Sequence, residues 1–408
     1  MAKKLITCIF LTLMCFPAFA DEMPDILIKI SGGHASVSIE ADDMTISGTE
    51  FDPVLDCLAG KIVSEVNPAV DELIESGTEK KDKVVPVKEH VHRMIGLYSV
   101  PGRNKITFTA KKNGISIDGD PSEYDHLVIE DKDGIQTCTG KDYRGRMEII
   151  HEKGKLILIN RITLEEYLNG MLDSEMSNTW PVEALKAQAV AARTYALFQK
   201  YYGGRCHYDM ESGVLSQVYK GLAHEHDSTI KAVEETAGQV LTKGGEPIMA
   251  LYHSCCGGAT QDNADVYGKK LSYLRSVKCQ YDSACPWYRW DSKETLKGIQ
   301  KDLEESGLYK GQVRSVRFDD KGRVAVTGTS GGANFRPEQL RAACGYSVLP
   351  SGMFTVKVSG GKVYFNGRGA GHGVGMCQWG ARGLAERSRD YRQILQQYYK
   401  GAEITKLY

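Results

Sequence analysis

The chain has 408 residues, with 51 Lys and Arg against 52 Asp and Glu, which leaves a formal net charge of −1. A balanced charge gives no long-range positive field for holding a polyanion, so the composition argues against nucleic-acid binding. With 42% hydrophobic and 25% charged residues, the composition is that of a globular protein and excludes disordered, collagenous and membrane-spanning classes. The length predicts two or three domains, each with its own core.

The first twenty residues have the pattern of an export signal. Lys3 and Lys4 precede an apolar run over 5–16, and residues 18–20 (AFA) match the small-x-small pattern of a cleavage site. The run is shorter than the roughly 20 residues that a membrane-spanning helix needs. We therefore predict a signal peptide over 1–20, cleaved near Ala20, and a mature protein in the periplasm or cell envelope. An uncleaved anchor is the alternative interpretation.

Period-two alternation of apolar residues predicts a β-rich region over 21–142. Such alternation occupies 25–60 and returns over 106–160, where Asp-Gly pairs mark turns. A short helix is expected after Pro68, and the charged run 79–83 is expected to be a solvated loop.

Helical periodicity begins at Leu164 and marks a mixed core over 143–408. We expect an α+β fold, in which the β-rich N-terminal region precedes a helix/strand catalytic core with a Gly-rich loop and a C-terminal helix. The expected helices cover 164–172, 181–200, 230–236, 293–306 and 378–399. The expected strands lie near 240 and over 249–252, 313–326 and 354–365.

Glu175 is the first candidate catalytic residue. It lies between two predicted helices, where a break in the backbone can direct a side chain into a cleft. Leu172, Met176 and Trp180 are close enough in sequence to shield it from water, which would keep its carboxyl protonated and able to donate a proton. The alternative is an ordinary solvated or helix-capping glutamate.

The Gly-rich loop 367–380 (GRGAGHGVGMCQWG) is the second candidate. Its alternating glycines are entropically costly and suit a backbone that approaches another backbone or a ligand closely. The loop lacks the patterns of dinucleotide- and phosphate-binding loops. We expect His372, Gln378 and Trp379 to offer a hydrogen-bonding and stacking surface for a sugar; a tight turn against the core is the alternative.

Removing Cys8 and Cys15 with the signal peptide leaves nine of the 11 cysteines, an odd number. Export favours disulfides, and we expect disulfides or plain thiols, with no metal and no cofactor. A zinc site is the alternative for a cluster that lies beside His253. That cluster comprises Cys255, Cys256, Cys279 and Cys285.

Several long motifs together resemble one known family. They are residues 160–170 (NRITLEEYLNG), 174–176 (SEM), 180–197 (WPVEALKAQAVAARTYAL), 253–260 (HSCCGGAT) and the Gly-rich loop. In this order they closely resemble the stage II sporulation protein D family, which includes the amidase enhancers. The resemblance runs from about Tyr143 to Tyr408, whereas 21–142 match little.

The resemblance implies a lytic transglycosylase that cleaves peptidoglycan glycan strands, preferably stripped of peptides, and leaves 1,6-anhydromuramic ends. By motif, Glu175 would be the catalytic acid and base, with Lys186 and Arg193 as supporting cleft residues on one face of the next helix. The chain departs from the family at Asp173, where proline is commoner, and it lacks the Cys-x4-His-Cys zinc run that some members carry before Gln217.

Two other functions are open at this stage. A non-catalytic peptidoglycan-binding protein could stimulate a cell-wall amidase, which would then be a partner. A zinc or thiol amidase built on His253 and the neighbouring cysteines is the third possibility, although adjacent strand residues point to opposite faces.

Overall fold

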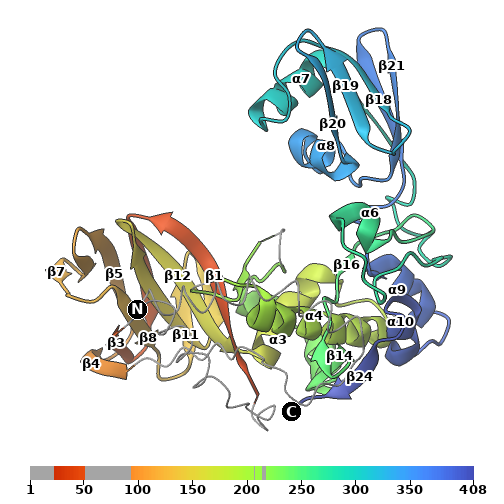
Figure 1. Ribbon diagram of the computed structural model, residues 1–408. Helices are drawn as coiled ribbons and strands as arrows, with labels where there is room; N and C mark the ends of the chain where they lie inside the picture. Colours follow the sequence, from red (N-terminus) through yellow and green to blue (C-terminus); the bar gives the residue numbers. More distant parts are fainter. Residues whose placement is uncertain (1–22, 51–92, 206, 214–216) are drawn as a thin grey trace, which may run out of the picture. The chain divides into compact units, whose positions relative to one another are not determined.

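The computed structural model describes residues 23–50, 93–205, 207–213 and 217–408. The chain divides into two compact units (Figure 1). The first unit combines 1–180, 188–249 and 403–408, and the second combines 181–187 and 250–402. The predicted signal peptide, the helix after Pro68 and the charged loop lie outside the described residues. Within the described ranges, no helix is both long and apolar enough to cross a membrane.

Two β-sheets form the N-terminal part of the first unit, which confirms the predicted β-rich region. The seven-stranded sheet has the order β13 (Met210–Glu211), β1 (Asp25–His34), β12 (Lys155–Thr163), β11 (Arg146–Glu152), β8 (His126–Glu130), β3 (Met44–Glu50) and β4 (Arg93–Val100). The six-stranded sheet has the order β10 (Lys141–Arg144), β9 (Ile135–Cys138), β2 (Ser36–Ala41), β5 (Asn104–Lys111), β6 (Gly114–Ile117) and β7 (Asp120–Pro121).

The two sheets are in contact, because β12 lies against both β2 and β5. Their alternating apolar side chains, such as Ile39, Phe108 and Leu158, are fully buried. Strands β11 and β12 follow residue 142, yet they pair with β8 and β1 of the N-terminal region. Strands on both sides of residue 142 therefore share one sheet.

The helices of the first unit follow β12 directly. They are α3 (Leu164–Glu175), most of α4 (Val182–Tyr202), the 3-10 turn η1 (Leu222–His224) and α5 (Asp227–Glu234). α3 begins at Thr163, whose hydroxyl accepts the amide of Glu166 as a helix N-cap. A small sheet of β15 (Glu246–Pro247), β14 (Gln239–Lys243) and β24 (Glu403–Lys406) completes the unit, so the last strand of the chain belongs to it.

The second unit contains short sheets and five helices within the described residues. Its strands are β16 (Tyr252–His253) with β23 (Met376–Cys377), β17 (Trp290–Thr295) with β22 (Lys362–Gly367) and β21 (Phe354–Ser359), and β18 (Val313–Phe318) with β19 (Val324–Gly328) and β20 (Gly331–Phe335). Its helices are α6 (Asn263–Tyr267), α7 (Leu296–Glu305), α8 (Pro337–Cys344), α9 (Gln378–Ala385) and α10 (Tyr391–Tyr398). α7 packs against β18 and α8 (Figure 1).

The mixed helix and strand content confirms the α+β class, with three local corrections. The predicted terminal helix over 378–399 is two helices, because the chain leaves helical geometry at Ser388, whose φ is +59°, and Asp390 caps α10. The first residues of the predicted helix 293–306 belong to β17. The short α8, which starts at Pro337, was not predicted.

A buried cluster of charges crosses the seven-stranded sheet. Glu148 on β11 accepts from His126 Nε2 on β8 at 3.0 Å and from Arg161 Nε on β12 at 2.5 Å. Burial raises the pKa of a carboxyl, but the contacts with His126 and Arg161 outweigh it, and the pKa of Glu148 lies well below its ordinary value. The carboxylate therefore ties the centre of three adjacent strands together.

We predict that Glu148→Gln lowers the free energy of unfolding by about 3–5 kcal/mol, because it leaves Arg161 largely buried beside a neutral amide. Equilibrium urea unfolding measures this loss. Glu152→Gln, at the exposed end of the same strand, is the control and should change stability by less than about 0.5 kcal/mol. Equal stability of the two variants would show that the Glu148 cluster contributes nothing to the free energy of unfolding.

Candidate functional site

Glu175 is the last residue of α3 and is half-buried. Its Oε1 accepts a hydrogen bond from the backbone amide of Val218 at 3.1 Å. The helix ends here, because the next residue, Met176, has extended backbone angles. The sequence placed Glu175 between two helices, and the structure places it at the point where the first of them stops.

The segment 217–219 carries the backbone amide that contacts Glu175, and its own side chains are anchored in the protein. Gln217 is fully buried; it accepts from the Tyr167 hydroxyl at 2.8 Å and donates to the Ala192 carbonyl at 3.2 Å. The hydroxyl of Tyr219 donates to Asn160 Oδ1 at 3.0 Å. Both neighbours of Val218 are therefore anchored, which fixes the amide that contacts Glu175. No sequence pattern had predicted that these residues belong to the site.

Asp173, two residues before Glu175, has its carboxylate engaged by other groups. Oδ1 accepts from the Asn178 amide at 3.1 Å, and Oδ2 lies 3.3 Å from His224 Nδ1 and 3.4 Å from His226 Nε2. Neither the orientation of Asp173 nor a role for the two histidines could be predicted from the sequence. The structure brings them together beside the end of α3.

Arg193 lies inside the first unit and is fully buried. Its guanidinium forms a bidentate pair with Glu165 at 2.8 and 2.6 Å, and donates to the carbonyls of Gln239 and Val233. Glu165 also accepts the hydroxyl of Tyr408. In this arrangement the guanidinium, which belongs to α4, contacts α3, α5 and the first residue of β14, and its donors point at protein groups.

Lys186 belongs to the second unit, with the first turns of α4. Its Nζ donates to Glu183 Oε1 at 2.8 Å and lies 5.9 Å from the centre of the Tyr391 ring. The other oxygen of Glu183 accepts the amide of Tyr391 at 2.8 Å. Lys186 thus has a carboxylate neighbour and an aromatic neighbour at the start of α10.

The Gly-rich loop lies against residues 251–261, so the structure brings two sequence motifs together. Cys255 and Ala370 exchange backbone hydrogen bonds at 3.0 and 2.8 Å, and the Gln261 amide donates to the Gly373 carbonyl at 2.7 Å. Gly375 has φ of +72°, and a Cβ there would collide with the Leu251 carbonyl. The loop therefore has the close backbone packing that its glycines predicted.

His372 lies in this loop with both ring nitrogens engaged. Nε2 donates to the Tyr252 carbonyl at 2.9 Å, and Nδ1 accepts from the Val374 amide at 3.2 Å. Burial, with the nearby His253 as a smaller cause, lowers the pKa of His372 to about 3. His253 is buried, and burial lowers its pKa to about 4. Both rings are neutral at neutral pH.

Gln378 is the first residue of α9 and is buried, directly after Cys377. The same unit has five buried thiols, which belong to Cys255, Cys256, Cys279, Cys285 and Cys377, and the buried carboxylate of Asp282 lies against three of them. The sequence missed Asp282, although its position three residues after Cys279 and three before Cys285 was a signal. All described cysteines, including Cys138 and Cys344 elsewhere, are free thiols.

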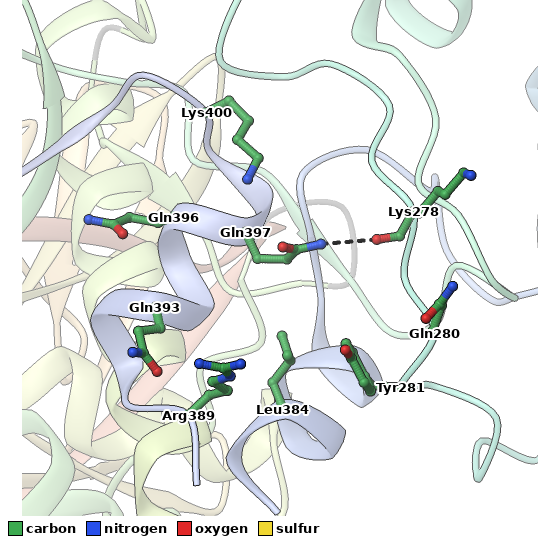
Figure 2. Close-up of a pocket in the computed structure, with 9 residues that line it drawn as sticks. All are labelled: Lys278, Gln280, Tyr281, Leu384, Arg389, Gln393, Gln396, Gln397 and Lys400. Carbon is green, nitrogen blue, oxygen red and sulfur yellow. Dashed lines mark hydrogen bonds between the residues drawn. The ribbon is translucent and has the colours of Figure 1, made fainter. Parts of the chain in front are cut away.

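The second unit also has a surface pocket of about 480 Å³ between the 278–281 segment and the two C-terminal helices (Figure 2). Gln397 donates to the Lys278 carbonyl at 3.0 Å across it. Its lining is basic and rich in amides, with no carboxylate. The lining residues are Lys278, Gln280, Tyr281, Leu384, Arg389, Gln393, Gln396, Gln397 and Lys400, which include none of the predicted site residues.

The sequence comparisons agree with the motifs. A family description, "Stage II sporulation protein", matches residues 152–242, which include α3 and α4. The stage II sporulation protein D of Bacillus subtilis is 30% identical over 263 residues, which cover 61% of this chain and 76% of that protein. The chain belongs to the stage II sporulation protein D family.

Two further relatives extend this family assignment. An uncharacterised protein of Brachyspira hyodysenteriae is 33% identical over 281 residues, 68% of this chain and 76% of that protein. The amidase enhancer of Bacillus subtilis is 31% identical over 290 residues, 58% of this chain but only 40% of that protein. The predicted membership of the stage II sporulation protein D and amidase enhancer family is confirmed.

We predict that Arg193→Met destabilises the first unit by about 3–5 kcal/mol, because it leaves the Glu165 carboxylate without its cation. Urea unfolding measures the change. Adding Glu165→Gln should recover part of the loss, since the unpaired charge is then removed. Lys231→Met, on the exposed side of α5, is the control and should stay within about 0.5 kcal/mol of the wild type. An Arg193→Met variant as stable as the Lys231→Met control would contradict the stabilising role of the Arg193–Glu165 pair.

We predict that His372 makes the second unit less stable as the pH falls from about 6.5. Its pKa is about 3 in the folded state and 6.5 without the fold, so only the unfolded state takes up a proton between these values. Over this range, uptake of one proton by the unfolded state lowers the free energy of unfolding by about 1.4 kcal/mol for each pH unit of decrease. His372→Gln should flatten the decline between pH 6 and 4 in urea unfolding. An unchanged slope would contradict this assignment.

Proposed function

We propose that this protein is an exported lytic transglycosylase, which cleaves peptidoglycan glycan strands and forms 1,6-anhydromuramic ends. Membership of the family supports a cell-wall function and a location in the envelope. The observation that carries the finer proposal is the placement of Glu175. It is a half-buried carboxyl at the end of α3, inside the segment that matches the family description, and a backbone amide fixes it.

A single carboxyl is sufficient for this reaction. Glu175 donates its proton to the glycosidic oxygen that links muramic acid to glucosamine, and the bond from that oxygen to C1 of muramic acid breaks. The 6-hydroxyl of the same muramic acid then attacks C1, and the carboxylate of Glu175 removes the hydroxyl proton. Nucleophile and electrophile share one sugar ring, so the substrate itself supplies their proximity.

The neighbouring charges support the proton-donor role of Glu175. A hydrolytic glycosidase ordinarily needs a second carboxylate, and the nearest one in sequence, Asp173, is engaged by His224, His226 and an amide. Arg193 and Lys186 would oppose a protonated acid if they faced it. Their contacts with Glu165 and Glu183 give both cations other partners.

We propose different roles for the remaining predicted residues. Arg193 supports the site by holding α3 and α4 together, and it acts through Glu165. Lys186, His372 and Gln378 are proposed to contribute to substrate binding in the second unit. None of them lines the basic, amide-rich pocket of that unit, which we propose as a separate surface for a hydroxylated polymer that bears carboxylates.

Glu175→Gln is the decisive variant. It preserves the shape of the side chain but cannot donate the proton, so release of 1,6-anhydro products should fall by about 10²–10⁴-fold. Mass spectrometry of products from peptide-stripped glycan strands measures this release. The control is Glu234→Gln, an exposed glutamate on α5, which should retain wild-type activity. Normal cleavage by Glu175→Gln would refute the assignment.

The alternative is a non-catalytic protein that binds peptidoglycan and stimulates a cell-wall amidase, and the relative named amidase enhancer favours it. This function predicts faster amidase cleavage of sacculi in the presence of the protein and no anhydro ends. In that case the Glu175→Gln variant would stimulate the amidase to the same extent as the wild-type protein.

A further inference from the structure

Three separate segments of the second unit bring thiols to one buried point. Cys256 follows β16, Cys279 lies in the loop before β17, and Cys377 ends β23 and caps α9. Asp282, from the same loop as Cys279, is fully buried between them. No step of the proposed reaction uses these residues.

The four donor atoms have the arrangement of a metal site. The three Sγ atoms and a carboxylate oxygen of Asp282 all lie within 4.8 Å of one another. In a tetrahedral zinc site, with bonds of about 2.3 Å to sulfur and 2.0 Å to oxygen, the donors are about 3.5–3.8 Å apart. We propose that Cys256, Cys279, Cys377 and Asp282 bind one zinc ion.

Asp282 provides an independent reason for a cation. Its Oδ2 accepts the amides of Gly257 at 2.7 Å and Gly258 at 3.3 Å, and lies 3.1 Å from the Sγ of Cys256. Its Oδ1 is buried and has no hydrogen-bond partner among the described residues. The oxygen that faces the sulfurs is Oδ2, which also lies 3.5 Å from the Sγ of Cys255 and 3.8 Å from the Sγ of Cys377. A fully buried carboxylate is costly without a cation, and a metal ion at this point would supply one.

The sulfur of Cys377 has the surroundings of a bound thiolate. It accepts the backbone amides of Cys256 and Gly380, both at 3.3 Å. Such N–H···S contacts stabilise negative charge on sulfur and are usual around metal-bound thiolates. Gly380 leaves the space for this packing, because a Cβ there would contact the Sγ of Cys279 at 2.5 Å.

Disulfides account for this cluster less well. A bond between Cys256 and Cys279 leaves Cys377 with Cys255 as its neighbouring thiol, and any such bond leaves the buried carboxylate of Asp282 without a cation. Cys255 and Cys285 lie outside the donor set; the sulfur of Cys285 accepts the Trp287 amide at 3.4 Å. Zinc binding needs no oxidant, because each thiol loses a proton to solvent as its sulfur binds the ion.

Four buried protein donors leave no open position for water or substrate, so the site is structural. Zinc would hold the 279–282 loop against β16 and the start of α9. The neighbours of Cys279, Lys278 and Gln280, line the basic pocket (Figure 2). The ion would therefore also fix one wall of that pocket.

Elemental analysis of the purified full-length chain tests the proposal. The wild type should contain about one zinc per chain. Cys377→Ser and Asp282→Asn should raise the zinc dissociation constant, measured by chelator competition, by at least about tenfold. The matched controls are Cys344→Ser in the same unit and Cys138→Ser in the first unit, which remove buried thiols elsewhere and should bind zinc like the wild type.

A second measurement on the wild type keeps the test independent of variants that fail to fold. Removal of zinc by a chelator should lower the melting temperature, and added zinc should restore it. A wild type without zinc would overturn the proposal, and so would peptide mapping that finds Cys256, Cys279 or Cys377 in a disulfide. Unchanged zinc affinity in both site variants would overturn it as well.

Discussion

The hydrogen bond from the Val218 amide to the Glu175 carboxyl links the two halves of the candidate catalytic centre. One partner ends α3, and the other lies between Gln217 and Tyr219, whose side chains are anchored in the core of the first unit. A side chain at the end of a helix would otherwise choose among several rotamers. Because the amide is part of a fixed backbone, the carboxyl is positioned before any substrate arrives, which is the condition for efficient proton transfer.

Buried ion pairs supply much of the rigidity behind this centre. The Arg193–Glu165 pair joins α4 to α3. The Glu148 cluster lies in the sheet whose strand β12 directly precedes α3. Both use a carboxylate that touches several segments at once, so each fixes geometry more than it adds stability. Asp282 is likewise a buried carboxylate that contacts separate segments, through the amides of Gly257 and Gly258 and the sulfurs of Cys256 and Cys377.

Local signals in the sequence were sufficient for much of the fold. Periodicity located α3 within a few residues, and the alternating glycines of 367–375 predicted close backbone packing. Contacts between residues that are far apart in the sequence could not be predicted. The motif made Arg193 a supporting cleft residue, and its pairing with Glu165 could not be read from the sequence. The two histidines His224 and His226 contact Asp173, which lies some fifty residues earlier. Contacts of that kind depend on tertiary packing, which no local pattern encodes.

The strand β24, 403–406, pairs with β14 although the whole second unit separates them in the chain. During folding, the backbone groups on this edge of β14 therefore stay unpaired until residues 403–406 reach them. The first unit can complete its fold only after the second has emerged. A tag fused after Tyr408 would lie next to the strand whose pairing completes this small sheet.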